Sequence, residues 1–423
     1  MQRHIPSPLA IALGLTLFTA ILVWFISPEA ITLATLSNSW YKGFWELLGF
    51  SMQMVLILVL GHALALSPAA QALIDKLASA PKSSTQAVIM AAAFTMLAGL
   101  LNWGLGLIFG AILASSIGTE FKAKGKTLNY PLLVAASYTG MMVWHAGLSG
   151  SAPLKIANAS HFLEEKIGVI PVNRTLFTCE NFGVNLLVIT GTLVGLYFIG
   201  RSHKKSTLLN NAPDKITTPT TQARVSYFSK AVGFLVLAYA IYRHFSGWQA
   251  IDLNYINLVL FGLVFLAHSN LNQLGNAVQV ATGGASGIIM QFPLYAGIMG
   301  MLKYTGTLES LSANLITSAS TSTLPYLTFI SAGLINLLVP SGGGQWAVQG
   351  PVIMEAALQL KVAVEPIVMA LAYGDGLTNM LQPFWALPLL GITRLEAKDI
   401  ASYCFKIFLI GFLLYSLGIL LFY

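Results

Sequence analysis

The chain is dominated by apolar runs that are long enough to cross a membrane. The first run, Leu9 to Ile26, contains no charged residue, and about 20 apolar residues suffice for a helix to span the hydrocarbon layer. Hydrophobic residues make up 56% of the 423 residues and charged residues only 9%, with a mean hydropathy of +0.74. This composition predicts an all-α polytopic membrane protein, with on the order of 12 membrane segments.

The distribution of basic residues predicts the orientation of these segments. Lys and Arg concentrate on the cytoplasmic side of membrane proteins, and an N-terminus inside the cell places 15 of the 22 on that side. We therefore expect a multi-pass protein of the bacterial cytoplasmic (inner) membrane with a cytoplasmic N-terminus. Its net charge of +7 then follows from topology, and nothing predicts nucleic-acid binding. The two cysteines, Cys179 and Cys404, predict no disulfide framework.

A polar stretch divides the sequence into two halves. Residues 200–230 carry several basic residues, are rich in turn-forming residues and lack hydrophobic periodicity, as is typical of a linker. We expect a cytoplasmic linker at 200–230 between a first half, 1–199, and a second half, 231–423.

Short matches between the halves indicate an internal repeat. "LAGLLN" at 97–102 resembles "SAGLIN" at 331–336, and "NYPLLVAASYTG" from Asn129 resembles "VEPIVMALAYGD" from Val364. The shared Asn, Pro and Tyr positions matter most, because Leu-rich chains match by chance. In the first half the repeat predicts a hairpin at about 87–117 and a broken helix at about 131–154. In the second half it predicts a hairpin at about 324–360 and a broken helix at about 366–389.

The two copies are predicted to run in opposite directions. Lysines at 122, 124 and 126 place the start of the first broken helix inside, whereas Arg394 and Lys398 place the end of the second one inside. Such an inverted-topology repeat is typical of secondary transporters, whose site lies at the membrane midplane between discontinuous helices. We favour re-entrant hairpins over full crossings, a choice that the charge pattern leaves open. A third region, His268 to Leu302, is also expected to be broken.

Polar residues at the breaks are candidates for binding an anion. The hairpin turns, "NWGLG" at 102–106 and "PSGGGQW" at 340–346, offer glycines that let a ligand approach the backbone and free N–H groups that attract a carboxylate. A tight turn or a helix-packing contact is the alternative. The substrate-binding candidates are Asn102, Trp103, Gly104, Ser149, Ser151, Ser341, Gly342, Gly343, Gly344, Gln345, Thr378 and Asn379.

Asp375, the acid within the second broken helix, is the main candidate for cation coupling. An intramembrane carboxylate needs a cation, a partner or a proton, so Na⁺ could bind near Asp375 and Asn379, or Asp375 could carry a proton. A helix-capping role is the alternative. His145 could sense protons or contact a carboxylate, or could be a structural histidine. Thr139 and Asn336 complete this set, and no cofactor beyond Na⁺ is expected.

Three stretches resemble a known family. "GASGIIMQFPLYAGIMGM" (284–301), "VPSGGGQWAVQGPVIMEAA" (339–357) and "AYGDGLTNMLQPFWALPLLGI" (372–392) look like the short-chain fatty acid transporter family, the AtoE type, in the ion-transporter superfamily. The resemblance implies opposed hairpins, an elevator-like transport domain on a scaffold, and acetoacetate or butyrate as substrate. By analogy it implies a homodimer embedded in lipid. Dicarboxylate relatives carry Ser-Asn-Thr triplets at the hairpin tips, where this sequence has Asn102 to Gly104 and Ser341 to Gly343.

These observations predict a secondary active transporter of short-chain monocarboxylates, coupled to Na⁺ or H⁺. The alternatives are an anion channel or facilitator for small carboxylates, or a carrier for dicarboxylates. An intramembrane enzyme is not expected, because His, Asp and Glu do not cluster at the spacing of a metal or catalytic site.

Overall fold

The computed structural model describes residues 8–28, 30–46, 48–157, 159, 161, 163–202, 226–247, 253–307, 310, 319–337, 342–382 and 385–423, and these are folded as helices and their connections. By length and composition, five of the described helices can cross a membrane: Leu33–Ala65, Ser84–Leu101, Trp103–Ala123, Cys179–Arg201 and Ala397–Phe422. Shorter apolar helices accompany them. The all-α prediction is confirmed.

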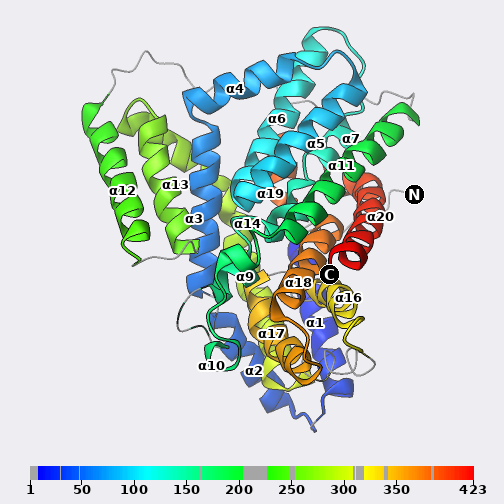
Figure 1. Ribbon diagram of the computed structural model, residues 1–423. Coiled ribbons are helices and arrows are strands. Elements are labelled where there is room, and N and C mark those ends of the chain that lie inside the picture. The colour runs from blue at the N-terminus through cyan, green and yellow to red at the C-terminus, as the bar shows by residue number, and fades with distance from the viewer. Residues whose placement is uncertain are drawn as a thin grey trace.

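Figure 1 shows three groups of helices. At one side α3 (Leu48–Ala65) packs against α13 (Leu253–Ala267), which packs in turn against α12 (Tyr227–Phe245). The long helix α14 (Leu271–Tyr304) contacts α3, α1 (Pro8–Ile26) and α2 (Leu33–Glu46). The third group contains both predicted hairpins and both predicted broken helices, together with α11 (Cys179–Ser202) and α20 (Ala397–Phe422). A short helix, α4 (Pro68–Ser79), follows α3.

A single polar residue divides the first hairpin into its two arms, α5 (Ser84–Leu101) and α6 (Trp103–Ala123). Asn102 between them adopts an extended conformation with φ −159° and ψ 128°, which ends α5. Its side-chain oxygen accepts a hydrogen bond from the Leu105 N–H (2.9 Å), so it also caps α6. The hairpin extends beyond the predicted span of 87–117 at both ends, to residues 84 and 123, and each arm is long enough to cross a membrane.

Side-chain amides connect the two arms of the second hairpin, α16 (Leu324–Asn336) and α17 (Gly342–Gln359). Gln345 Nε2 donates to the Ala332 carbonyl (2.9 Å) and to Gln349 Oε1 (2.9 Å), and Gln349 Nε2 donates to Ser331 Oγ (2.9 Å). Polar side chains bonded across helices stabilise helix pairs in membranes. Gln345 therefore fixes α17 against α16. The opposite orientation of the two hairpins stays a prediction.

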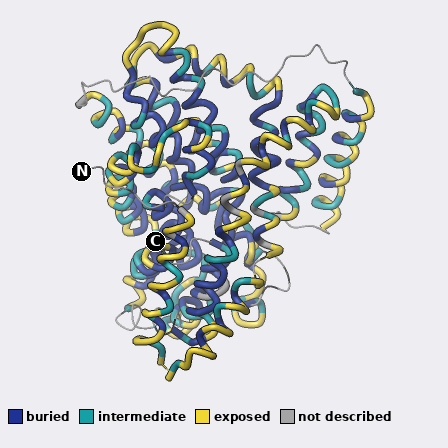
Figure 2. Tube along the Cα trace, turned by 180° about the vertical axis from the view of Figure 1, so that it is seen from behind, coloured by how far each residue is buried: buried dark blue, intermediate teal, exposed yellow. Residues whose placement is uncertain are grey.

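The two predicted broken helices are divided into short segments that pack on each other. The first consists of α7 (Tyr130–Ala136), α8 (Gly140–Val143), η1 (Trp144–Ala146) and α9 (Ser151–Ile156), and the second of α18 (Val364–Thr378), η4 (Asn379–Leu381) and α19 (Leu387–Thr393). Helix α18 contacts α8, η1 and α9. Segments from the two halves of the sequence thereby meet in the buried centre of the molecule, drawn dark blue in Figure 2.

The expectation of a third broken region was wrong. Helix α14 runs without interruption from Leu271 to Tyr304, with Pro293 inside it. Glycine costs about 1 kcal/mol in an exposed helix, but an unpaired backbone group in lipid costs more, which favours a continuous helix. Gly300 also permits close contact with Gly43 of α2, where a Cβ atom would collide with the facing backbone.

A connection from the first half of the sequence covers the second hairpin. After α9 it contains α10 (Glu164–Ile167) and η2 (Val172–Arg174), and it forms ion pairs between Lys166 and Glu355 and between Arg174 and Glu365. The last helix of the first half, α11, continues to Ser202 and thus extends into the predicted linker at 200–230. The rest of that linker, 203–225, and the N-terminal residues 1–7 lie outside the described residues.

Candidate functional site

A buried histidine and aspartate link the two broken helices. His145 of η1 and Asp375 of α18 are 0% and 1% exposed, and His145 Nδ1 is hydrogen-bonded to Asp375 Oδ2. The Ala152 N–H donates to His145 Nε2 (3.0 Å), so this nitrogen carries no proton and the imidazole proton belongs on Nδ1. Asp375 Oδ1 has no hydrogen-bond partner among the described residues. The pair therefore keeps one free oxygen in a buried position.

Asn336, the last residue of α16, organises the polar groups around Asp375. Its Nδ2 donates to the Asp375 carbonyl (2.8 Å), Thr378 Oγ1 (2.9 Å) and Asn379 Oδ1 (3.1 Å). Its own carbonyl accepts from Gln382 Nε2 (2.7 Å). Asn336, Thr378 and Asn379 are buried. The end of α16, the first arm of the second hairpin, is thus hydrogen-bonded to the break in the second broken helix.

The first residue of α17, Gly342, packs directly against the His145–Asp375 pair. A Cβ atom at Gly342 would lie 2.7 Å from His145 Cε1, 3.1 Å from Trp144 Cη2 and 3.2 Å from Asp375 Oδ2. Only glycine fits this approach without displacement. The structure thus brings Gly342, a substrate-binding candidate, next to His145 and Asp375, two candidates for cation coupling.

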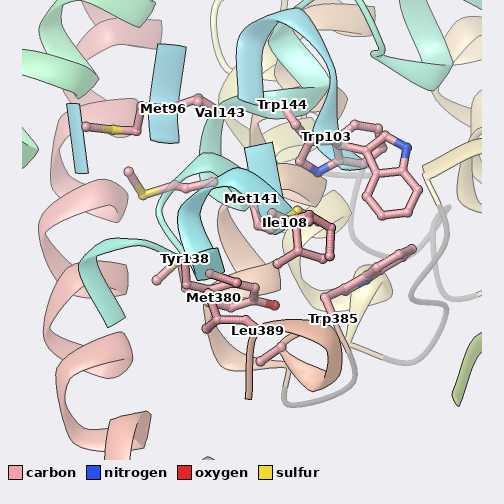
Figure 3. Packing of buried hydrophobic residues seen from close by; sticks show 14 of the residues in the cluster. Met96, Trp103, Ile108, Tyr138, Met141, Val143, Trp144, Met380, Trp385 and Leu389 are labelled. Atoms are coloured by element: carbon pink, nitrogen blue, oxygen red, sulfur yellow. The ribbon is translucent and has the colours of Figure 1, made fainter. Parts of the chain in front are cut away.

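Aromatic rings connect this pair to the tip of the first hairpin. Trp144 stacks on His145 with ring centroids 4.6 Å apart and lies 6.4 Å from Trp103. Trp103 meets Trp385 edge to face at 5.2 Å, and Trp385 meets Phe292 of α14 at 5.9 Å. Figure 3 shows Trp103 and Trp144 beside each other with Trp385 facing them. We call Trp103, Trp144, Trp385 and Phe292 the aromatic wall.

Several hydrogen-bond donors around the aromatic wall are buried without an acceptor. Asn102 Nδ2, Trp103 Nε1 and Trp144 Nε1 have no partner among the described residues, and their side chains are at most 5% exposed. Leaving a buried donor unpaired costs about 1–3 kcal/mol. Unpaired donors gathered beside an apolar wall are the pattern expected where a ligand supplies the acceptor.

The other substrate-binding candidates have different surroundings. Ser149 Oγ accepts the Trp103 N–H (3.0 Å) at the start of α6, whereas Ser151 Oγ has no partner among the described residues. A Cβ atom at Gly104 would meet Ile57 of α3, so Gly104 allows a helix contact. Gly343 and Gly344 lie in the first turn of α17. Ser341 lies outside the described residues.

Two further residues lie apart from the pair. Thr139 Oγ1 donates to the Ala136 carbonyl (2.7 Å) within its own break. Glu355, an acid in the second hairpin, is about half exposed and bonds Lys166 (2.8 Å). The oxygens around Asp375 fit a Na⁺ ion only in part, because Thr378 Oγ1 and Asn379 Oδ1 already accept from Asn336. Asp375 Oδ1 and Asn336 Oδ1 accept no hydrogen bond from the described residues.

Comparison with known proteins identifies the family to which this chain belongs. The family model described as short chain fatty acid transporter matches residues 1–422. The chain belongs to the short-chain fatty acid transporter family. A relative from Escherichia coli (strain K12) that carries this name provisionally is 36% identical over 100% of this chain and 97% of its own. One from Haemophilus influenzae, with the same provisional name, is 34% identical over 96% and 93%.

A solved transporter supports the fold. The crystal structure of the Alcanivorax borkumensis YdaH transporter aligns with 98% of this chain over 98% of its own chain, with a TM-score of 0.51 and 16% sequence identity. This short-chain fatty acid transporter family member is therefore a multi-pass membrane protein and not an enzyme. Its substrate is a small molecule.

Sequence reasoning missed two indoles of this transporter-family site, Trp144 and Trp385. Trp144 directly precedes His145 in the break, and Trp385 follows the second break. A tryptophan within a predicted broken helix, among glycines and polar residues, was the available signal.

Proposed function

We propose that this chain is a secondary active transporter that carries short-chain fatty acids, such as acetoacetate or butyrate, coupled to H⁺ or Na⁺. The observation that carries the proposal is the set of buried donors that have no acceptor among the described residues, Asn102 Nδ2, Trp103 Nε1 and Trp144 Nε1, beside the aromatic wall. A carboxylate accepts hydrogen bonds and donates none, so it would satisfy these donors, while a short alkyl tail would lie on the indole rings.

The aromatic wall supports a monocarboxylate over a dicarboxylate. Trp385 and Phe292 continue the wall beyond Trp103 and offer one donor between them, the Trp385 indole N–H, so a second carboxylate placed there would lose its hydration for at most one new hydrogen bond. A tail of a few carbons would instead gain about 0.8 kcal/mol for each buried CH₂ group.

The His145–Asp375 pair would couple this binding to a cation. With Asp375 ionised and His145 neutral, one negative charge is buried and Oδ1 has no donor among the described residues. Such a charge is costly inside a membrane, and a proton on Oδ1 or a Na⁺ ion beside it would remove the cost. Because Gly342 packs on the pair, a change in the charge of Asp375 would shift the position of the second hairpin. Asn336, Thr378 and Asn379 would hold the pair in place, and Thr139 lies farther away in the same break.

Uptake into proteoliposomes tests the proposal. Purified protein should accumulate labelled butyrate above its equilibrium level when a pH gradient or a Na⁺ gradient is imposed. The gradient that drives accumulation identifies the coupling ion. Flux that only dissipates an existing butyrate gradient would instead assign the chain to the channel or facilitator class.

We further propose that the protein lies in the bacterial cytoplasmic membrane with its N-terminus inside. The proposal is supported by the 15 of 22 basic residues that this orientation places in the cytoplasm. The expected homodimer and the elevator-like division into scaffold and transport domains belong to the same proposal.

A further inference from the structure

A pocket of about 110 Å³ lies outside the site described above, between α16, α18 and α20. Ile330 and Leu334 line it from α16, Leu377 and Thr378 from α18, and Phe412 from α20. The pocket lies on the side of the second hairpin that faces α20, whereas His145 and Trp144 lie at the start of α17.

The lining of this pocket offers hydrocarbon and no free polar group. Thr378 contributes the one polar side chain, and its hydroxyl is satisfied, since it donates to the Gly374 carbonyl (3.1 Å) and accepts from Asn336 Nδ2 (2.9 Å). Apolar cavities of this size stay dry and bind small hydrocarbons. The pocket therefore selects an apolar occupant and disfavours a carboxylate.

The mouth of the pocket opens toward the lipid-facing side of the molecule. Leu334 at the mouth is 51% exposed, whereas Leu377 at the floor is 1% exposed. Helix α20 is long and apolar enough to cross a membrane, and only 28% of its most apolar stretch is buried within the protein. The medium that surrounds such a helix is the hydrocarbon of the bilayer.

From this geometry we infer that the pocket binds the end of one acyl chain of a membrane lipid. The bound chain fills the gap between α16 and α20 and contacts Thr378, which shares the Asn336 side chain with the Asp375 carbonyl. A lipid chain is thereby one hydrogen-bonded residue away from Asp375, in a pocket whose lining offers no free donor to a carboxylate. The inference concerns lipid binding and does not depend on which ion drives transport.

Photolabelling of the full chain in lipid vesicles tests this inference. The probe is phosphatidylethanolamine with a diazirine at the end of one acyl chain, and the labelled residues are identified by mass spectrometry of peptides. Lipid at the outer surface reaches exposed residues such as Leu413, 68% exposed, but it reaches Leu377 only by entering the pocket. We expect adducts on Leu377 in the wild-type protein.

Two substitutions with equal added bulk distinguish the pocket from the general surface. Leu334→Trp closes the mouth and should reduce labelling of Leu377 at least tenfold, whereas Leu413→Trp should leave it unchanged. Ile330→Phe fills the pocket from inside and serves as a second variant if Leu334→Trp does not fold.

Three results would overturn the inference. Adducts confined to exposed positions such as Leu413 would show that no chain enters. Equal labelling of Leu377 in the wild type and in both pocket variants would show that the label arrives by another route. Displacement of the label by excess butyrate would assign the pocket to the tail of the substrate instead.

Discussion

The contact between Gly342 and the His145–Asp375 pair makes a quantitative prediction for Gly342→Ala. The added methyl carbon would lie 2.7 Å from His145 Cε1, where ordinary contacts begin near 3.4 Å. The imidazole cannot easily move away, because Asp375 bonds one nitrogen and the Ala152 N–H bonds the other. The start of α17 must therefore move by several tenths of an ångström.

Excess volume of this kind in a packed interior costs about 1–3 kcal/mol. The same free energy lowers the population of the state in which α17 packs on the His145–Asp375 pair, here called the closed hairpin, by about 5- to 150-fold. Apparent affinity falls with the population of the competent state. If only the closed hairpin binds substrate tightly, the KM for butyrate should rise by a similar factor while the protein remains folded.

Proteoliposome uptake at graded butyrate concentrations measures this change, and thermal melting of the purified protein measures folding. Gly391→Ala is the matched control, since a Cβ atom there would meet nothing within 4 Å, and it should behave as wild type. A wild-type KM for Gly342→Ala, at equal melting temperatures, would refute the reasoning that the hairpin closes on the pair.

Three further predictions concern the polar groups of the site. Asp375→Asn should abolish gradient-driven accumulation of butyrate but retain part of the counterflow exchange; unchanged accumulation would remove Asp375 from coupling. Trp103→Phe removes one indole donor and should weaken butyrate binding, measured by calorimetry, by about 1.5–3 kcal/mol, the worth of a hydrogen bond to a charged group; the exposed Trp45→Phe should have no effect, and equal affinities would contradict the donor role. Asn336→Ala removes the donor that three buried acceptors share and should lower the free energy of unfolding by on the order of 2 kcal/mol, visible as a lower melting temperature; an unchanged melting temperature would show that these bonds add no net stability.

Local rules were sufficient for the class of fold and for the position of one break. Apolar runs of membrane length predict helices, and the polar turn residues between two such runs predicted the break at 102–106. The cap that Asn102 forms on α6 was not predicted. The same rules failed for α14, where each glycine suggested a break. Backbone hydrogen bonds in lipid and contact with α2 favoured continuity instead.

The site itself depends on contacts that no local rule contains. The sequence offered proton sensing, contact with a carboxylate or a structural role for His145 without identifying which residue it meets, and the structure brings it to Asp375, 230 residues away. Trp144 and Trp385 were missed for the same reason, since their importance arises from facing Trp103 in space. Gln345, expected to bind substrate, lies across the hairpin arms because Ala332 and Gln349 supply partners.

The division of the pair between the two halves has a consequence for biosynthesis. Ribosomes and translocons deliver the first half well before the second, so the newly inserted η1 segment holds a buried histidine whose carboxylate does not yet exist. That histidine and the indoles beside it are left in lipid or against early helices until residue 375 arrives. The core is thus completed late in synthesis. A chain truncated anywhere before α18 lacks Asp375 and should be degraded by quality-control proteases.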